Sequence, residues 1–203
     1  LKGVIDKITQ IGQKGYSSNR QCQEVLMTLV DEIQTCKNTG KKGALISLDI
    51  RKAFDTISHS YINQAYKFFN FGDYIIKWLN LLGTNRRACI IIEDDLHTKF
   101  FDLERGNAQG DKTSPYIFNI GYQILILKLN FDLQIEGTIA PAPVPPDLAP
   151  PAGPVSVTAR KAYAFADDGN IMSTLNFNSL RRIKEILDDF GALSGLECLS
   201  LIH

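Results

Sequence analysis

The sequence predicts a mixed α+β domain whose strands pair as hairpins. Apolar residues recur at helical spacing in several segments, whereas short apolar runs bounded by charged residues or glycine indicate buried strands. A third observation is the turn signal Asp167-Asp168-Gly169 between two such runs. The 203 residues are enough for one large domain, or two small ones, with a buried core.

The composition excludes several classes of protein. Hydrophobic residues make up 44% and charged residues 22%, which is ordinary for a globular domain and unlike collagen, a disordered tail or a disulfide-rich toxin. No apolar run approaches the roughly 20 residues that span a bilayer, so we expect no membrane partner. The formal net charge of zero is evidence against a free-standing nucleic-acid binder. Because the chain opens with Leu1 rather than Met, we expect a fragment of a longer polypeptide.

The N-terminal quarter departs from this neutral average. Residues 1–52 contain nine Lys and Arg against five Asp and Glu, which gives this segment a net charge of +4. Such a segment suits contact with phosphates, and it equally suits a solvated surface. Charge alone leaves both interpretations open.

The four cysteines predict no metal or disulfide site. They are Cys22, Cys36, Cys89 and Cys198, without C-x-x-C spacing or a histidine at zinc-finger distance. We expect buried free thiols in a reducing compartment.

Periodicity defines the elements of the first half of the chain. Residues Cys22, Leu26, Leu29, Ile33 and Cys36 define one face of a helix over about 20–37. A buried strand follows at 44–49, and two helices at 57–70 and 73–82. Segments 87–93 and 98–103 form a hairpin with Asp94-Asp95 at its turn.

The second half contains two helices around a hairpin. Ser114 is placed to cap a helix that runs to about Asn130, with Pro115 in its first turn. Strands at 161–165 and 170–174 flank Asp167-Asp168-Gly169. The last helix presents Leu180, Ile183, Leu187 and Phe190, and we expect it to end near Gly191.

A proline-rich segment interrupts the second half at 140–156. Seven of the eight prolines lie between Pro141 and Pro154, which excludes a core strand or helix. We expect a solvated connector of polyproline type, and the PxxP spacing leaves a ligand for an SH3-type domain as the alternative.

Three Asp-Asp pairs occur, and one of them points to chemistry. Asp94-Asp95 and Asp188-Asp189 suit a hairpin turn and a polar helix face, whereas Asp167-Asp168 directly follows an apolar strand. Adjacent carboxylates there repel each other, and a hard cation such as Mg²⁺ would relieve that repulsion. Asp49 also ends an apolar strand, so neighbouring strands would bring three carboxylates together as a two-metal site. A merely polar turn is the alternative.

These segments resemble the motifs of reverse transcriptases, particularly those of non-LTR (LINE-type) retrotransposons. Leu48-Asp49-Ile50-Arg51-Lys52-Ala53-Phe54-Asp55 resembles motif A, and Phe165-Ala166-Asp167-Asp168 resembles the aromatic-x-D-D box of motif C. Residues 105–120, with Gln109 and Gly110, resemble motif B, and 193–197 resemble the opening of motif D. Residues 13–20 resemble the fingers segment before motif A. The order matches the family over nearly the whole chain.

The resemblance implies a polymerase palm with partial fingers and no thumb, divided into fingers at 1–43 and palm at 44–203. It implies RNA-directed DNA synthesis, in which dNTPs are added to the 3′ end of a DNA primer on an RNA template. Two Mg²⁺ ions would be held by Asp49, Asp167, Asp168 and the Ile50 carbonyl, and Mn²⁺ would substitute.

The same resemblance assigns further roles, each with a structural alternative. Phe54 would be the steric gate against a 2′-hydroxyl, or simply part of the core. Gln109, Gly110 and Arg20 would contact the nucleotide, with Gln109 alternatively capping a helix. Lys14 would contact nucleic acid or, in place of Arg20, the triphosphate. Arg51 and Lys52 would contact nucleic acid or be solvated. We expect His59 at the surface or at a cap, because this chemistry requires no histidine base.

Several positions depart from the family pattern. Lys112 replaces the usual proline after Gln109-Gly110-Asp111, and Cys198-Leu199 do not continue motif D as expected. The proline-rich segment lengthens the connection between motifs B and C. These departures leave open a catalytically inactive, polymerase-derived module that binds nucleic acid or protein. A palm of another class, such as a group II intron maturase or a telomerase-like polymerase, is the third interpretation.

Overall fold

The computed structural model describes residues 2–9, 12–16, 21–83, 86–93, 96–108, 110–138 and 160–202. Four sequence predictions lie outside these ranges: the roles of Arg20 and Gln109, the Asp94-Asp95 turn, and the conformation of the proline-rich segment at 140–156.

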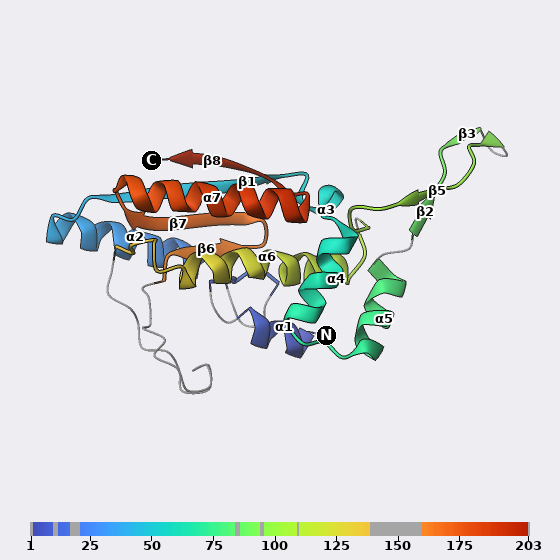
Figure 1. The fold of residues 1–203 in the computed structure, drawn as a ribbon, viewed down its shortest axis with the longest axis horizontal. Coiled ribbons are helices and arrows are strands. Elements are labelled where there is room, and N and C mark those ends of the chain that lie inside the picture. Colours follow the sequence, from blue (N-terminus) through green and yellow to red (C-terminus); the bar gives the residue numbers. More distant parts are fainter. Residues whose placement is uncertain are drawn as a thin grey trace.

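A four-stranded antiparallel sheet forms the centre of the molecule (Figure 1). Its order is β6-β7-β1-β8, from β6 (Ala162–Phe165), β7 (Asp168–Thr174), β1 (Gly43–Arg51) and β8 (Glu197–Ile202). The central strand β1 alternates buried and more exposed residues along its length, because successive side chains of a strand point to opposite faces of the sheet. The α+β class is confirmed, and β8 is a strand that the sequence did not predict.

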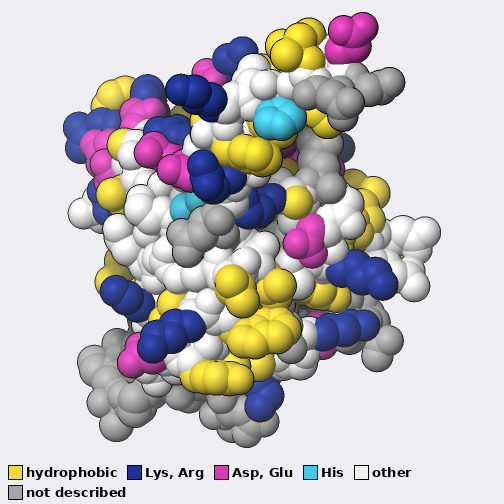
Figure 2. Space-filling model, turned by 90° about the vertical axis from the view of Figure 1, so that its right-hand side faces the viewer, with side chains coloured by type: hydrophobic (Ala, Val, Ile, Leu, Met, Phe, Trp, Pro, Cys, Tyr) yellow, Lys and Arg dark blue, Asp and Glu magenta, His cyan; other side chains and the backbone are white. Residues whose placement is uncertain are grey.

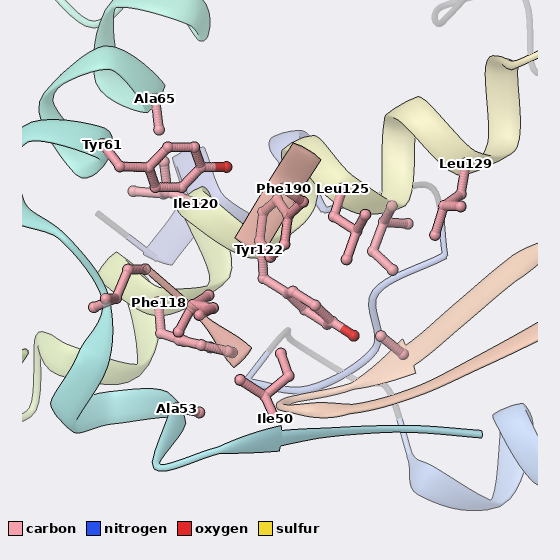
Figure 3. Close-up of a cluster of buried hydrophobic side chains, with 14 of the residues drawn as sticks. Ile50, Ala53, Tyr61, Ala65, Phe118, Ile120, Tyr122, Leu125, Leu129 and Phe190 are labelled. Carbon is pink, nitrogen blue, oxygen red and sulfur yellow. The ribbon is translucent and has the colours of Figure 1, made fainter. Parts of the chain in front are cut away.

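The main core lies on one face of this sheet. Helices α6 (Ser114–Phe131) and α7 (Phe177–Ser194) cover that face (Figure 1). Figure 3 shows Ile50 of β1 close to Phe118 and Tyr122 of α6 and Phe190 of α7. Helix α6 is apolar on nearly all sides, as expected for a helix buried within a core.

The opposite face of the sheet is covered only in part, by α2 (Cys22–Thr39). Val25 and Leu29 of α2 pack against Tyr163 and Met172 of the sheet. The buried stripe of α2 is Val25, Leu29, Glu32 and Cys36. The predicted stripe is therefore confirmed at Leu29, Ile33 and Cys36. It was wrong at Leu26, which is 56% exposed, and at Cys22.

Three of the four cysteines are not buried as expected. Cys22 is exposed at the start of α2, and Cys89 and Cys198 are half-buried; only Cys36 is buried. All four are free thiols, as predicted. Cys22 is exposed because it precedes the buried stripe, which begins at Val25.

Short helices and a projecting hairpin follow β1. They are α3 (Ala53–Thr56), which the sequence did not predict, and α4 (His59–Phe68) and α5 (Asp73–Gly83), which lie close to the predicted segments. The predicted hairpin is confirmed as two short ladders, β2 (Arg86–Ala88) with β5 (Phe101–Leu103) and β3 (Ile91–Glu93) with β4 (Leu96–His97). It projects from the body of the molecule (Figure 1).

Two helix ends differ from the sequence prediction. The N-cap of α6 is Thr113, not Ser114, whose hydroxyl instead donates to the Ala108 carbonyl at 2.7 Å. Helix α7 continues past Gly191 to Ser194 and ends at Gly195, which has a φ of 75°. A left-handed residue is the usual helix stop, and Gly191 remains helical because the buried stripe includes Ser194.

An apolar groove lies between α1 (Lys2–Ile8) and α5. Its lining includes Val4, Ile8, Tyr74, Ile75 and Trp78. Apolar side chains gather over α5 in the lower half of Figure 2. None of the helices in the described part of the chain combines the length and apolar character that crossing a bilayer requires.

Candidate active site

The three predicted carboxylates lie at one end of the sheet. Strand register pairs Leu48 of β1 with Gly169 of β7, and Asp49 and Asp168 are the chain neighbours of this last pair. Leu48 is buried in the main core, and Asp49, its neighbour along the strand, is exposed on the face that α2 only partly covers. Asp167 is half-buried in the turn before β7. The structure therefore places Asp49, Asp167 and Asp168 at the same end of the sheet.

The carboxylates influence one another electrostatically. Burial raises the pKa of Asp168, and the negative charges of Asp167 and Asp49 raise it further. This upward shift means that Asp168 gives up its proton less readily than an isolated carboxyl. A cation placed among these groups would reverse the effect, because it stabilises the charged form.

The donor chemistry of this site suits a hard divalent cation, but the ligands are not gathered around one point. Carboxylate oxygens are the ligands that Mg²⁺ prefers. Among the described residues, no three Asp, Glu, His or Cys side chains form a ready metal cage. Ile50 lies in β1 opposite Cys198 of β8, with its side chain in the core.

The β6–β7 hairpin, which we call the carboxylate hairpin because it carries Asp167 and Asp168, turns one residue earlier than predicted. Phe165 pairs with Asp168, so Ala166 and Asp167 form the turn, whereas Asp168 and Gly169 belong to β7. Gly169 is required inside the strand, because a Cβ there would lie 2.4 Å from the Tyr122 hydroxyl oxygen. Figure 3 shows Tyr122 reaching from α6 toward this hairpin.

The half-buried position of Phe54 is compatible with both of its predicted roles, as a steric gate and as a core residue. This residue lies in α3 and packs against the core, with its ring centroid 5.1 Å from that of Phe118. The Phe54 carbonyl accepts a hydrogen bond of 2.6 Å from the Asn107 amide, which ties α3 to the segment before Gly110. Core packing thus holds the ring, and the side chain as a whole remains partly exposed.

Gly110 is exposed in the loop before α6. Its φ is 83°, and a Cβ added there would meet open space. The loop is ordered on its C-terminal side by Asp111, whose carboxylate accepts hydrogen bonds from the Thr113 amide at 2.8 Å and the Thr113 hydroxyl at 2.9 Å. These bonds fix the approach to α6 without a proline at position 112.

Three basic residues predicted to contact nucleic acid have different environments. Lys14 forms a 2.8 Å ion pair with Glu24, and Arg51 forms an exposed 3.1 Å pair with Glu197. Lys52 is exposed and left-handed, with a φ of 48°, immediately before α3. Exposed ion pairs contribute little stability, so Arg51 remains available to a competing phosphate.

His59 was wrongly expected at the surface or at a cap. It is buried, and its Nε2 hydrogen-bonds the Gly106 carbonyl oxygen at 2.7 Å, which also accepts from Arg86 at 2.7 Å. His59 therefore joins α4 to the segment leading to Gly110. No local sequence signal distinguishes such a long-range contact from a surface histidine.

Comparison with known proteins identifies the family. A family profile described as "Reverse transcriptase (RNA-dependent DNA polymerase)" matches residues 2–199. A retrovirus-related Pol polyprotein from the type-1 retrotransposable element R2 of Popillia japonica is 36% identical over 103 residues, covering 51% of this chain and 17% of the relative. A second R2 Pol polyprotein from this organism is 29% identical over 133 residues, covering 66% and 19%. The chain thus spans about a fifth of the length of these curated relatives.

Solved structures support the fold. Telomerase from Candida albicans, in complex with a fragment of telomeric RNA, matches with a TM-score of 0.67 at 10% identity, covering all of this chain and 34% of that one. Apo telomerase from Candida tropicalis matches with a TM-score of 0.61 over 98% of this chain and 33% of that one. At this identity the likeness shows the polymerase palm fold alone. The family profile and the R2 relatives confirm the resemblance read from the motifs, and the chain belongs to the reverse transcriptase family.

Proposed function

We propose that this chain is the palm, with part of the fingers, of an RNA-directed DNA polymerase of the non-LTR retrotransposon type. The observation that carries the proposal is that Asp49 of β1 and Asp168 of β7 directly follow and precede the paired residues Leu48 and Gly169, with Asp167 in the adjoining turn. Residues 1–43 correspond to partial fingers and 44–203 to the palm in this proposal.

The proposed chemistry is two-metal nucleotidyl transfer. Asp49, Asp167 and Asp168, with the Ile50 carbonyl, would hold Mg²⁺, or Mn²⁺ in its place. When bound, the metal ions activate the primer 3′-hydroxyl and stabilise the phosphoryl transition state.

The remaining predicted residues would serve the substrates. Phe54 would exclude the 2′-hydroxyl of ribonucleotides, and Gly110, Gln109 and Arg20 would contact the dNTP. Lys52, Arg51 and Lys14 would contact the phosphates of the RNA template or the DNA primer. The sequence relatives favour the retrotransposon class over a telomerase-like enzyme, because the telomerase likeness is structural at 10% identity.

Primer extension tests the proposal. The parent chain is incubated with a DNA primer on an RNA template, dNTPs and Mg²⁺ or Mn²⁺, beside Asp167→Ala and the matched surface control Asp189→Ala. We expect extension by the parent and by the control, and none by Asp167→Ala. Template binding without extension in any of the three would favour the inactive binding module instead.

A further inference from the structure

The residue that precedes Asp167 has an unusual backbone conformation. Ala166 has a φ of 59°, in the left-handed region that alanine rarely adopts. It is the first residue of the two-residue turn between β6 and β7. Its conformation sets the direction in which the chain enters Asp167. Such a residue persists only where its surroundings fix it.

The side chain of Gln13 hydrogen-bonds both the amide and the carbonyl of Ala166, and we call this pair of bonds the grip. Gln13 is completely buried, and its Nε2 donates to the Ala166 carbonyl oxygen at 2.9 Å. Its Oε1 accepts from the Ala166 amide at 3.0 Å and from the Gly15 amide at 2.8 Å. One amide group therefore satisfies both backbone hydrogen-bonding groups of the left-handed residue.

The segment that carries Gln13 is itself held in place. Ala164 of β6 donates to the Gly12 carbonyl at 2.8 Å, and the Lys14 amide donates to the Ala164 carbonyl at 2.8 Å. Asn119 of α6 donates to the Gly15 carbonyl at 2.7 Å. A Cβ on Gly15 would lie 2.1 Å from the Ala166 nitrogen, so this segment lies directly against the turn.

We propose that Gln13 is a positioning residue for the carboxylate hairpin, holding Ala166 left-handed so that Asp167 is presented to the metal ions. Gln13 acts through Ala166 and need not touch substrate or metal. The inference rests on the proposed function, since it assigns Gln13 to that same site. Alanine pays a conformational cost at this φ that glycine does not, so glycine at position 166 should make the grip dispensable.

The test uses Gln13→Met, which preserves the length of the side chain and removes its hydrogen bonds. In the full 203-residue chain we measure hydrogen exchange at the Ala166 amide, and Mn²⁺ affinity by proton relaxation. We expect the amide to exchange about tenfold faster, as the loss of one buried hydrogen bond implies. Mn²⁺ affinity should weaken several-fold. The matched control is Gln34→Met on the exposed face of α2, which should change neither quantity.

Rescue separates positioning from general packing. Ala166→Gly in the Gln13→Met background should restore most of the Mn²⁺ affinity, because glycine adopts the turn without the grip. A double variant that stays as weak as Gln13→Met would overturn the proposal, and so would an unchanged Ala166 exchange rate in Gln13→Met. Should Gln13→Met fail to fold by circular dichroism, Gln13→Glu retains the acceptor and should keep the Ala166 amide protected; loss of that protection contradicts the grip.

The two proposals fail in distinguishable ways. A parent chain that neither binds Mn²⁺ nor extends a primer would contradict the proposed polymerase function. The exchange rate of the Ala166 amide tests the hydrogen bond from Gln13 independently, because this measurement requires no metal, nucleotide or template.

Discussion

At the residue scale, the site depends on a close packing contact beneath it. Tyr122 is fully buried, and its hydroxyl has no hydrogen-bond partner among the described residues. Burial raises the pKa of Tyr122, and the nearby carboxylates of Asp167 and Asp168 raise it further, so the hydroxyl stays protonated. The oxygen fills the space that a side chain at position 169 would require.

Gly169→Ala should destabilise the protein by about 1–3 kcal/mol, because its Cβ would overlap the Tyr122 oxygen. Tyr122→Phe removes that oxygen and leaves no broken hydrogen bond, so it should cost little alone and recover part of the loss in the double variant. Urea denaturation of the four proteins measures the coupling. Strictly additive free energies of unfolding would show that the clash lies elsewhere, for example with Leu48.

Phe54→Val should admit ribonucleotides if the ring is the proposed steric gate. The ratio of kcat/KM for a dNTP over the matching NTP should fall by about tenfold or more, because discrimination by steric fit is then lost. The core contact with Phe118 predicts a simultaneous stability loss of about 1–3 kcal/mol. Phe131→Val, at an exposed phenylalanine of α6, is the control. Reduced stability with unchanged sugar discrimination would assign Phe54 to the core alone.

At the element scale, a buried carboxylate joins α2 to the sheet. Glu32 accepts hydrogen bonds from the Thr138 hydroxyl, at 2.9 Å, and from the Tyr163 hydroxyl of β6. Burial raises the pKa of Glu32, and these two hydrogen bonds lower it by less than burial raises it. The folded protein therefore holds the Glu32 proton more tightly than the unfolded chain does.

This shift predicts a loss of stability as pH rises. The stabilisation from Glu32 is complete below its unfolded pKa, near 4.5, and declines as pH rises from there to the raised folded value. Glu32→Gln should flatten this part of the stability curve, because glutamine does not titrate. Thermal unfolding between pH 4 and pH 8 measures this pH dependence of stability. Glu185→Gln, on the exposed face of α7, is the control. A parallel decline in parent and Glu32→Gln would place the titrating group elsewhere.

The elements show which predictions local sequence supports. β1, α4, α5 and the β2–β5 hairpin follow from periodicity and turn residues, because those signals arise within each segment. β8 was missed, because its apolar run near the chain end carries no boundary signal. Its pairing with β1, which lies far away in the sequence, leaves no local signal either. Likewise the carboxylates could be singled out by residue type, whereas Gln13 and His59 act through contacts far along the chain.

At the scale of the whole molecule, the neutral net charge limits long-range attraction to nucleic acid. We expect the proposed binding of a primer–template to depend on local phosphate contacts and to weaken steeply with salt. Lys52→Ala should lower the slope of log Kd against log salt by about one, and Lys184→Ala on α7 should not. Fluorescence anisotropy between 50 and 200 mM salt, the range over which phosphate contacts are screened, measures this. Salt-independent binding would contradict contact through phosphates.

The groove between α1 and α5 determines what intrinsic fluorescence can report. Trp78 is the single tryptophan of the chain, and it is 56% exposed in the lining of that groove. Indole emission will therefore report on the surroundings of this groove, whereas far-ultraviolet circular dichroism follows all helices and strands. Coincident unfolding curves from the two probes would mean that α1 and α5 unfold together with the palm sheet. An earlier fluorescence transition would mean that they separate first.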